Sequence, residues 1–229
     1  MARLRRGVAW TKSTFILAAV AVVIVVVAIG SLCSKAQVTG QTSEERSDSI
    51  CRLADEKPRG AGEAIAAAAV GEADPVVRRA ALLALGRFPG GQYRQVVEAG
   101  TRDAEAMVRA QAAATLGMYD DAAACRLGEL LTGDADEGVR LGALAGLGRI
   151  RGHRATALVV RAIDGDDSLA VRLRAVETLG ARFGFSVPDP IDPRTPAGVE
   201  RIRNIVKMFP DVTEALEKYP PEQARAGDR

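Results

Sequence analysis

Aromatic side chains are scarce in this 229-residue sequence, where Trp, Tyr and Phe together make up 4% of the residues. Proteins that bind single-stranded nucleic acid stack its bases on aromatic side chains, so this composition argues against that function. An excess of charge of one sign is missing as well, because 31 basic residues face 29 acidic ones. Recognition of duplex nucleic acid usually needs a strong basic excess or stripe. We therefore expect no nucleic-acid partner, and a core built from Ala, Leu, Val and Ile.

Residues and motifs that carry catalysis are few. The single histidine, His153, has no partner at the spacing of a hydrolytic triad or metal site, and we interpret it as a solvated loop residue. Phosphate-binding G-x-x-x-x-G-K and G-x-G-x-x-G motifs are absent, as is G-x-S-x-G. The acidic residues around 134–137 and 164–167 lack the pattern of a calcium loop, and helix capping explains them. We expect no enzyme, no cofactor, no metal and no small-molecule ligand.

The three cysteines, Cys33, Cys51 and Cys125, are far apart and form no C-x-x-C pair. This spacing excludes a disulfide framework and a cysteine metal cluster. A Cys51–Cys125 disulfide stays open for an oxidising compartment. The alternative is that Cys125 is a small buried hydrophobic residue within a helix.

Residues 15–32 contain no charged side chain. A helix of that length spans roughly 27 Å, close to the hydrocarbon thickness of a bilayer. The preceding segment, residues 1–14, is basic. We therefore predict one transmembrane helix at residues 15–33 in a bacterial inner membrane. The N-terminus would lie in the cytoplasm and the rest of the chain outside it.

Two other interpretations of this segment stay open. Ser34 and Ala36 have the size of residues at a signal-peptidase site, although the apolar run exceeds the usual length of a cleavable signal. Cys33 would be the lipidated residue of a lipoprotein, but Leu32 stands where such sites usually carry Gly or Ala. The following residues, 34–49, are polar, and we interpret them as a tether with no core of its own.

A period of about 31 residues organises the next part of the chain. Val-Arg occurs at 77–78, 108–109, 139–140 and 171–172, and Leu-Gly at 85–86, 116–117, 147–148 and 179–180. Both dipeptides recur at intervals of 31, 31 and 32 residues, a spacing typical of stacked helical units. We predict an all-α solenoid of about four helix pairs over residues 50–187. In each unit a helix A, a tight turn and a helix B follow one another.

The units share further positions. Asp74, Asp136 and Ser168 stand three residues before the recurring Val, where they would cap helix B, and Glu105 is a weaker cap. A glycine three residues earlier in three of the units would end helix A in the left-handed conformation. The recurring arginines would pair with turn carboxylates of their own or the next unit. The structural repeat positions are Asp74, Arg78, Gly86, Arg109, Gly117, Asp136, Arg140, Gly148, Arg172 and Gly180.

The end of the chain leaves the period. Residues 188–196 include four prolines and are expected to form an extended linker. Residues 197–219 have the pattern of two short amphipathic helices, which would cap the open end of the stack. Residues 220–229 are expected to be a disordered tail.

The pattern D-x-x-V-R-x-x-A-x-x-x-L-G occurs as DPVVRRAALLALG at 74–86 and as DEGVRLGALAGLG at 136–148. It resembles the HEAT-like repeats of the phycobilisome-lyase type. The resemblance covers about residues 62–184 and implies an α-solenoid. Such repeats serve lyase subunits, adaptors and scaffolds alike, so the resemblance implies no single activity.

From these observations we expect a non-enzymatic, membrane-tethered adaptor that presents a groove lined by helix B to another protein. The candidate contacts are exposed helix B residues: Arg79, Gln111, Arg174 and Glu177. Two alternatives stay open. One is a lyase or lyase-assisting subunit for a linear tetrapyrrole, which only the resemblance suggests. The other is a spacer subunit of a membrane complex.

A second candidate surface is basic. Arg149, Arg151 and Arg154 lie near the C-terminal end of a helix B, where complementarity to the helix dipole explains positive charge without any ligand. In the functional alternative, this edge docks an acidic partner or anionic lipid headgroups. Asp120 and Asp121 interrupt the edge one unit earlier and count against that alternative.

Overall fold

A computed structural model describes residues 36–88, 90–184, 195–208 and 210–220. The described residues from 37 onward belong to one compact unit. The predicted transmembrane segment, its basic flank, the linker up to residue 194 and the tail from residue 221 all lie outside the described residues. Within the described ranges, every helix falls short of the length or the hydropathy that crossing a bilayer requires.

Every regular element in the described ranges is helical, which confirms the all-α prediction. The A helices are α3 (Ala61–Gly71), α5 (Arg94–Gly100), α7 (Ala123–Gly133) and α9 (His153–Gly165), and the short 3₁₀ helix η1 (Gly91–Tyr93) leads into α5. The B helices are α4 (Pro75–Leu85), α6 (Ala106–Leu116), α8 (Glu137–Arg149) and α10 (Leu169–Phe183).

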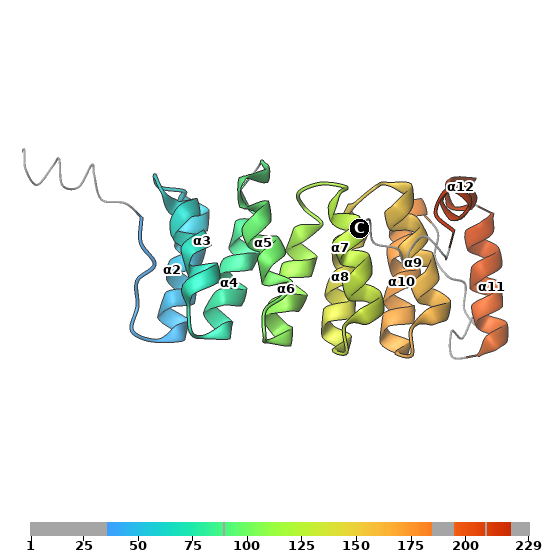
Figure 1. The fold of residues 1–229 in the computed structure, drawn as a ribbon, viewed down its shortest axis with the longest axis horizontal. Coiled ribbons are helices and arrows are strands. Elements are labelled where there is room, and N and C mark those ends of the chain that lie inside the picture. Colours follow the sequence, from blue (N-terminus) through green and yellow to red (C-terminus); the bar gives the residue numbers. More distant parts are fainter. Residues whose placement is uncertain (1–35, 89, 185–194, 209, 221–229) are drawn as a thin grey trace, which may run out of the picture. The chain divides into compact units, whose positions relative to one another are not determined.

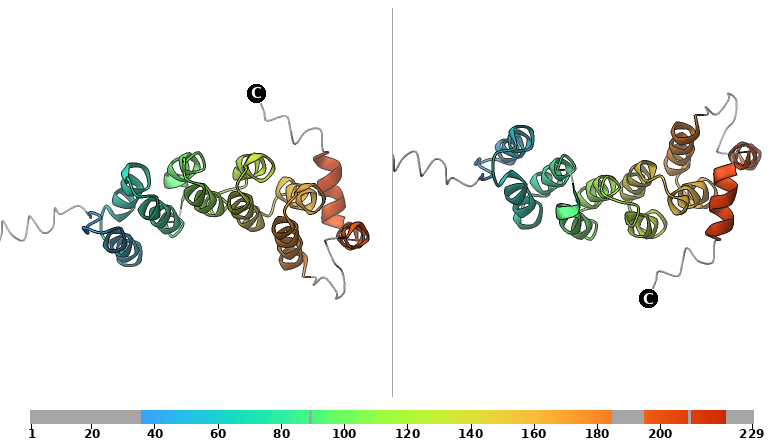
Figure 2. Two further views of the ribbon diagram at one scale, coloured as in Figure 1. Left: turned by 90° about the horizontal axis from the view of Figure 1, so that it is seen from below. Right: turned by 90° about the horizontal axis from the view of Figure 1, so that it is seen from above.

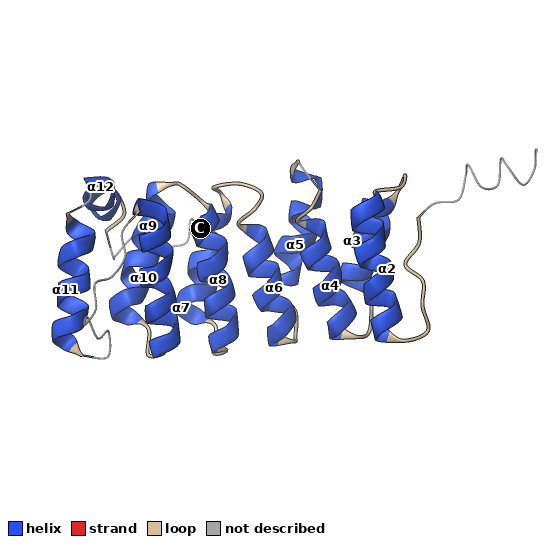
Figure 3. Cartoon of the chain, turned by 180° about the vertical axis from the view of Figure 1, so that it is seen from behind, coloured by secondary structure: helices blue, strands red, loops and turns tan. Residues whose placement is uncertain are grey.

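The helix pairs stack in two layers (Figure 1). Each B helix contacts the next one along the chain, and the A helices pack against one side of this row. The two rows are seen end-on in Figure 2, and Figure 3 views the stack from the side of the B helices. Val77, Ala81 and Leu85 of α4 are fully buried between the layers. Their spacing of four residues places them on one face of the helix, as predicted.

The stack begins earlier than predicted. Helix α2 (Ser43–Glu56) contacts α4 as a further B-type helix, so residues 43–49 are not part of a tether. Thr42 and Glu45 form a capping box at its start: Thr42 Oγ1 accepts a hydrogen bond from the Glu45 N–H at 3.1 Å, and Glu45 Oε2 accepts one from the Thr42 N–H at 3.2 Å. Ile50 and Ala54 are buried. The tether prediction was wrong because residues 43–49 carry no apolar side chain, and the buried residues of this helix, Ile50 and Ala54, follow them.

The turn between helices A and B is not the left-handed glycine turn that we expected. The glycines Gly71, Gly133 and Gly165 end their helices with φ outside the positive range. The residue after each of them is extended instead, as at Asp134, with φ −78° and ψ 132°. Asp74, Asp136 and Ser168 do cap helix B through their side chains, and Glu105 makes no such bond, as predicted.

Glycines allow two B helices to approach closely. A Cβ atom added to Gly146 of α8 would lie 2.5 Å from the carbonyl oxygen of Ala113 in α6. A Cβ at Gly142 would overlap the carbonyl oxygen of Ala110. The backbones of α6 and α8 are therefore in contact. Gly117, from the recurring Leu-Gly pair, keeps a right-handed φ of −64°, so its small size rather than left-handed geometry explains its presence.

Two helices cover the C-terminal end of the A layer. Helices α11 (Pro196–Lys207) and α12 (Pro210–Lys218) pack against α9, as expected for capping helices. Arg203 of α11 pairs with Asp164 at 2.6 Å. His153 is the first residue of α9 and not a loop residue, and its Nδ1 lies 3.6 Å from Glu214 of α12.

Candidate functional site

An arginine ladder connects successive units at the edge of the stack that carries the A–B turns. Arg109 donates from Nε and Nη2 to the two carboxylate oxygens of Asp134 in the next unit, at 2.9 and 3.0 Å. Its Nη1 donates to the carbonyl oxygens of Asp103 and Ala104 in its own turn, at 3.0 and 2.9 Å. The same four bonds recur with Arg78 and Asp103, and with Arg140 and Asp166.

Each rung of the ladder is a charged pair. The hydrogen bond from Arg109 lowers the pKa of Asp134, and the same bond raises the pKa of Arg109. Asp134 Oδ1 also accepts from the N–H of Asp136, the cap of the next helix B, at 3.0 Å. The rung therefore fixes the turn of one unit against the helix start of the next. Both oxygens of each carboxylate accept hydrogen bonds from the protein, which indicates a structural role for the rungs.

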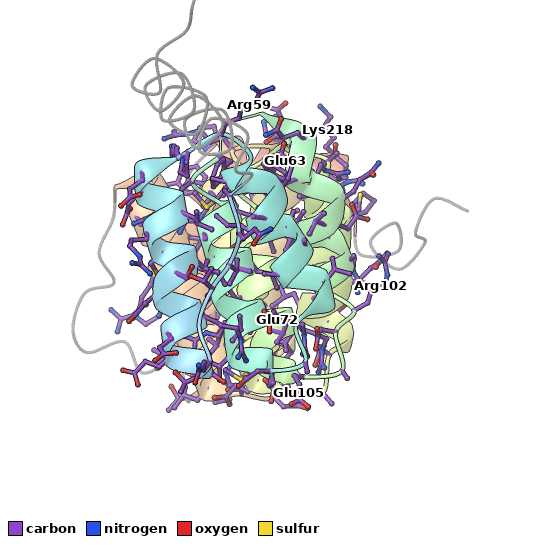
Figure 4. The ribbon with its side chains drawn as sticks, turned by 90° about the vertical axis from the view of Figure 1, so that its left-hand side faces the viewer. Arg59, Glu63, Glu72, Arg102, Glu105 and Lys218 are labelled. Carbon is purple, nitrogen blue, oxygen red and sulfur yellow. The ribbon has the colours of Figure 1, made fainter. Side chains whose placement is uncertain are left out.

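The ladder starts with a substitute pair. In the first turn Arg46 of α2 lies 3.2 Å from Glu72, which stands one period before Asp103. Glu72 and Glu105 lie toward the same edge of the molecule in Figure 4, and Arg59, Glu63 and Lys218 lie toward the opposite edge. The sequence prediction left open whether the arginines pair within or between units. The structure shows pairing with the next unit.

The outward side of the B helices carries exposed hydrophobic residues. The described residues include seven large hydrophobic side chains that are exposed, and five of them lie on or directly after a B helix. We call the outward side of α4, α6, α8 and α10 the B face. Its exposed hydrophobic residues are Val76, Leu83, Met107, Met118 and Leu173. The other two exposed residues are Val70 and Met208. An apolar cluster on one face is typical of a contact surface.

Small residues lie between these hydrophobic side chains. Ala80, Ala110, Ala114 and Gly142 are half-buried on the same side of the layer, and Ala145 is exposed. Because the exposed or half-buried alanines have short side chains, a partner can approach α6 and α8 closely, whereas Gly142 serves the contact between these two helices. The B face therefore has large exposed hydrophobic side chains with small residues between them.

The four predicted contact residues lie on the B face. Arg79 is exposed on α4. Gln111 is half-buried, and its Nε2 donates to Thr115 Oγ1 at 3.1 Å. Arg174 and Glu177 pair with each other at 3.4 Å across one turn of α10. The hydrophobic neighbours of these residues were not predicted from the sequence. Met107 stands one period after Val76, and that interval was the available signal.

The basic edge is only partly available to a ligand. Arg149 and Arg151 are exposed. Arg154 instead lies 5.1 Å from the ring of Tyr219 and donates to the sulfur of Cys125. Arg182 of α10 is engaged within the repeats: it donates to the Leu147 carbonyl oxygen at 2.7 Å, and burial lowers the pKa of its guanidinium. A continuous basic surface therefore does not form at these arginines.

The cysteine predictions need correction. Cys51 and Cys125 are free thiols, and both are exposed. They form no disulfide, and Cys125 is not the buried hydrophobic residue that we expected. In the described part of the chain, no three His, Cys, Asp or Glu side chains are grouped to hold a metal ion.

A family model described as HEAT repeats matches the sequence twice, at residues 62–127 and at residues 126–193. The two matches cover more than half of the chain. They begin in α3 and extend past the end of α10, so α2, α11 and α12 flank the matched region. No curated protein matches the sequence.

Proposed function

The chain belongs to the HEAT-repeat family, and we propose that it is a non-enzymatic, membrane-tethered adaptor that binds another protein through the B face. HEAT repeats suggest a protein-interaction scaffold, because stacked helix pairs present an extended surface. The observation that carries the proposal is the concentration of exposed hydrophobic residues on the B face. No particular contact in the described ranges favours the tetrapyrrole-lyase or the spacer alternative.

The size of the B face constrains the partner. Four helices at a spacing of about 9 Å, each roughly 17 Å long, present a projected area of about 600 Å². A stable interface buries about 800 Å² on each partner. A partner that touches only one or two B helices would fall well short of that area. We therefore propose that the partner contacts all four B helices of the matched region.

Charge substitutions on the B face test the proposal. Leu83→Asp together with Met107→Asp places two carboxylates on the B face, at side chains that are 58% and 37% exposed. We expect co-purification of the partner from cross-linked membranes to fall at least tenfold. Val70→Asp, on α3, is the matched control, because Val70 is also exposed but lies in the A layer. If the Leu83→Asp, Met107→Asp variant and the Val70→Asp control recover equal amounts of the partner, the proposal is contradicted.

The membrane tether is supported by the uncharged residues 15–32 and the basic flank before them. Carbonate washing should leave the full-length protein in the membrane pellet, and its release into the supernatant would refute the tether.

Two exposed thiols test the predicted orientation. Cys51 and Cys125 lie in the repeats, and a Cys33→Ser background removes the third thiol. In a bacterial host with a permeabilised outer membrane, a membrane-impermeant maleimide should label both thiols while the inner membrane is intact. Labelling only after lysis would place the repeats in the cytoplasm.

A further inference from the structure

The last arginine of the ladder, Arg172, makes only one of the four hydrogen bonds that each of the three preceding arginines makes. Nη1 of Arg172 donates to the Asp166 carbonyl oxygen at 3.5 Å, which repeats the contact to its own turn. Its Nε is shielded from solvent and has no hydrogen-bond acceptor among the residues that the structure describes. In the three preceding units, Nε donates to an aspartate of the next unit. None of the described residues therefore supplies to Arg172 the half of the rung that the next unit supplies in the preceding turns.

The number of residues between each ladder arginine and its aspartate explains why Arg172 has no such partner at the expected position. Each paired arginine meets an aspartate 25 or 26 residues later. The same count from Arg172 arrives at Ala197 and Gly198, which carry no carboxylate. Both residues lie in α11, whose arginine Arg203 pairs with Asp164 rather than extending the ladder. The capping helices close the A layer without replacing the missing aspartate.

We propose that Arg172 is a docking site for an aspartate of a partner protein at the C-terminal end of the stack. The three occupied rungs define the chemistry of the ligand. Each of their aspartates stands two residues before the N-terminal cap of a helix and accepts the N–H of that cap residue as well as the guanidinium. The partner would present the same group: an aspartate in the turn that enters a helix. The site does not depend on the B face, so either proposal can fail alone.

Arginine side-chain resonances provide a direct test. In the full chain, labelled with ¹⁵N-arginine and held in detergent, Arg172→Lys assigns the Nε–H signal of Arg172. Acetate, a simple carboxylate, is titrated into the protein. A parallel titration with sodium chloride at the same ionic strength is the control. We expect a saturable downfield shift of the Arg172 signal. The signals of Arg78, Arg109 and Arg140 should stay in place, because their acceptors are already present. Arg79, exposed on α4, controls for non-specific attraction of acetate.

A peptide probe tests the geometry of the ligand. Residues 131–140 of this chain, LTGDADEGVR, carry a helix-entry aspartate, Asp134. We expect this peptide to shift the Arg172 signal at a concentration at least tenfold lower than acetate, since it also supplies a matching turn. The same peptide with Asp134→Asn should be at least tenfold weaker. Equal binding of the two peptides would overturn the proposed ligand.

An acceptor within the chain is the competing explanation. Asp189 and Asp192 lie outside the described residues. If one of them fills the site, the Arg172 signal will coincide with those of the occupied rungs before any acetate is added. It will then move upfield in Asp189→Asn or Asp192→Asn. That result, or an Arg172 signal that responds to acetate no more than Arg79 does, overturns the proposal.

Discussion

Removal of one carboxylate from the arginine ladder shows how strongly the rungs hold the stack together. Asp134→Asn keeps the size of the side chain but removes the charge that receives two hydrogen bonds from Arg109. The Arg109 side chain is 20% exposed and that of Asp134 is 10% exposed. This pair is therefore closer to a buried ion pair than to a surface one.

The expected cost follows from that burial. Surface ion pairs contribute about 0–1 kcal/mol, whereas loss of one partner from a fully buried pair costs about 3–5 kcal/mol. Asn keeps one oxygen that can accept from Arg109 or from the Asp136 N–H. We therefore expect Asp134→Asn to lower the free energy of unfolding by about 2 kcal/mol. For a protein of this length, that corresponds to a fall in Tm of about 4–8 °C.

Urea unfolding of the full chain in detergent, followed by circular dichroism, measures this change. Arg149→Gln is the control, because Arg149 is exposed at the end of α8, and we expect a change within about 0.5 kcal/mol. The double variant Arg109→Gln with Asp134→Asn should cost less than the sum of the two single changes. If Asp134→Asn is no more destabilising than Arg149→Gln, the ladder does not stabilise the stack.

Three further predictions concern the same framework. The pKa of Asp134 is lowered in the folded state, so its contribution to folding stability is present above its unfolded pKa of about 3.9 and is lost as pH falls through the lower folded value. The difference in the free energy of unfolding between wild type and Asp134→Asn should therefore shrink below about pH 4. A difference that does not depend on pH would contradict this. Gly146→Ala should destabilise by about 1–3 kcal/mol in urea unfolding, because its Cβ would meet the Ala113 carbonyl; Gly133→Ala, with nothing within 4 Å of its Cβ, should be neutral or slightly stabilising, and equal effects would refute the close approach of α6 and α8. Ser168→Ala should cost about 1 kcal/mol by the loss of the cap on α10, and an unchanged unfolding midpoint would show that the cap contributes little.

The period of the sequence was sufficient to predict the helix pairs. Val77 and Leu85 recur because each unit buries the same face of its helix B in the core. The spacing of apolar residues in the sequence therefore indicates which residues are buried. Arg78 recurs because it serves the same rung in every unit. Positions under a repeated physical constraint are therefore readable from a single chain.

Features that occur once were harder to predict. Helix α2 was missed because polar residues outnumber apolar ones in it, although the T-x-x-E of its capping box at residues 42–45 was a usable signal. The pairing of the arginines with turn carboxylates was predicted, but not which carboxylates, because the capping residues of the same turns are also acidic. The aspartates Asp103, Asp134 and Asp166 recur with the same period two residues earlier.

The B face shows the limit of sequence reasoning for a binding site. Met107 repeats the position of Val76, but Leu83 is followed one and two periods later by the small residues Ala114 and Ala145, so the period indicates only part of this surface. Only the folded arrangement shows that these side chains share one side of the layer. A partner surface of this kind follows from exposure in the structure rather than from a motif.

Site-specific cross-linking in native membranes tests the central claim, that the B face binds a partner protein. A photoactivatable amino acid is placed at Leu83, at Met107 or, as control, at Val70, which is 68% exposed in the A layer. We predict that positions 83 and 107 capture the same protein and that position 70 does not. The account is contradicted if position 70 captures that protein equally well, or if the two B-face positions capture none.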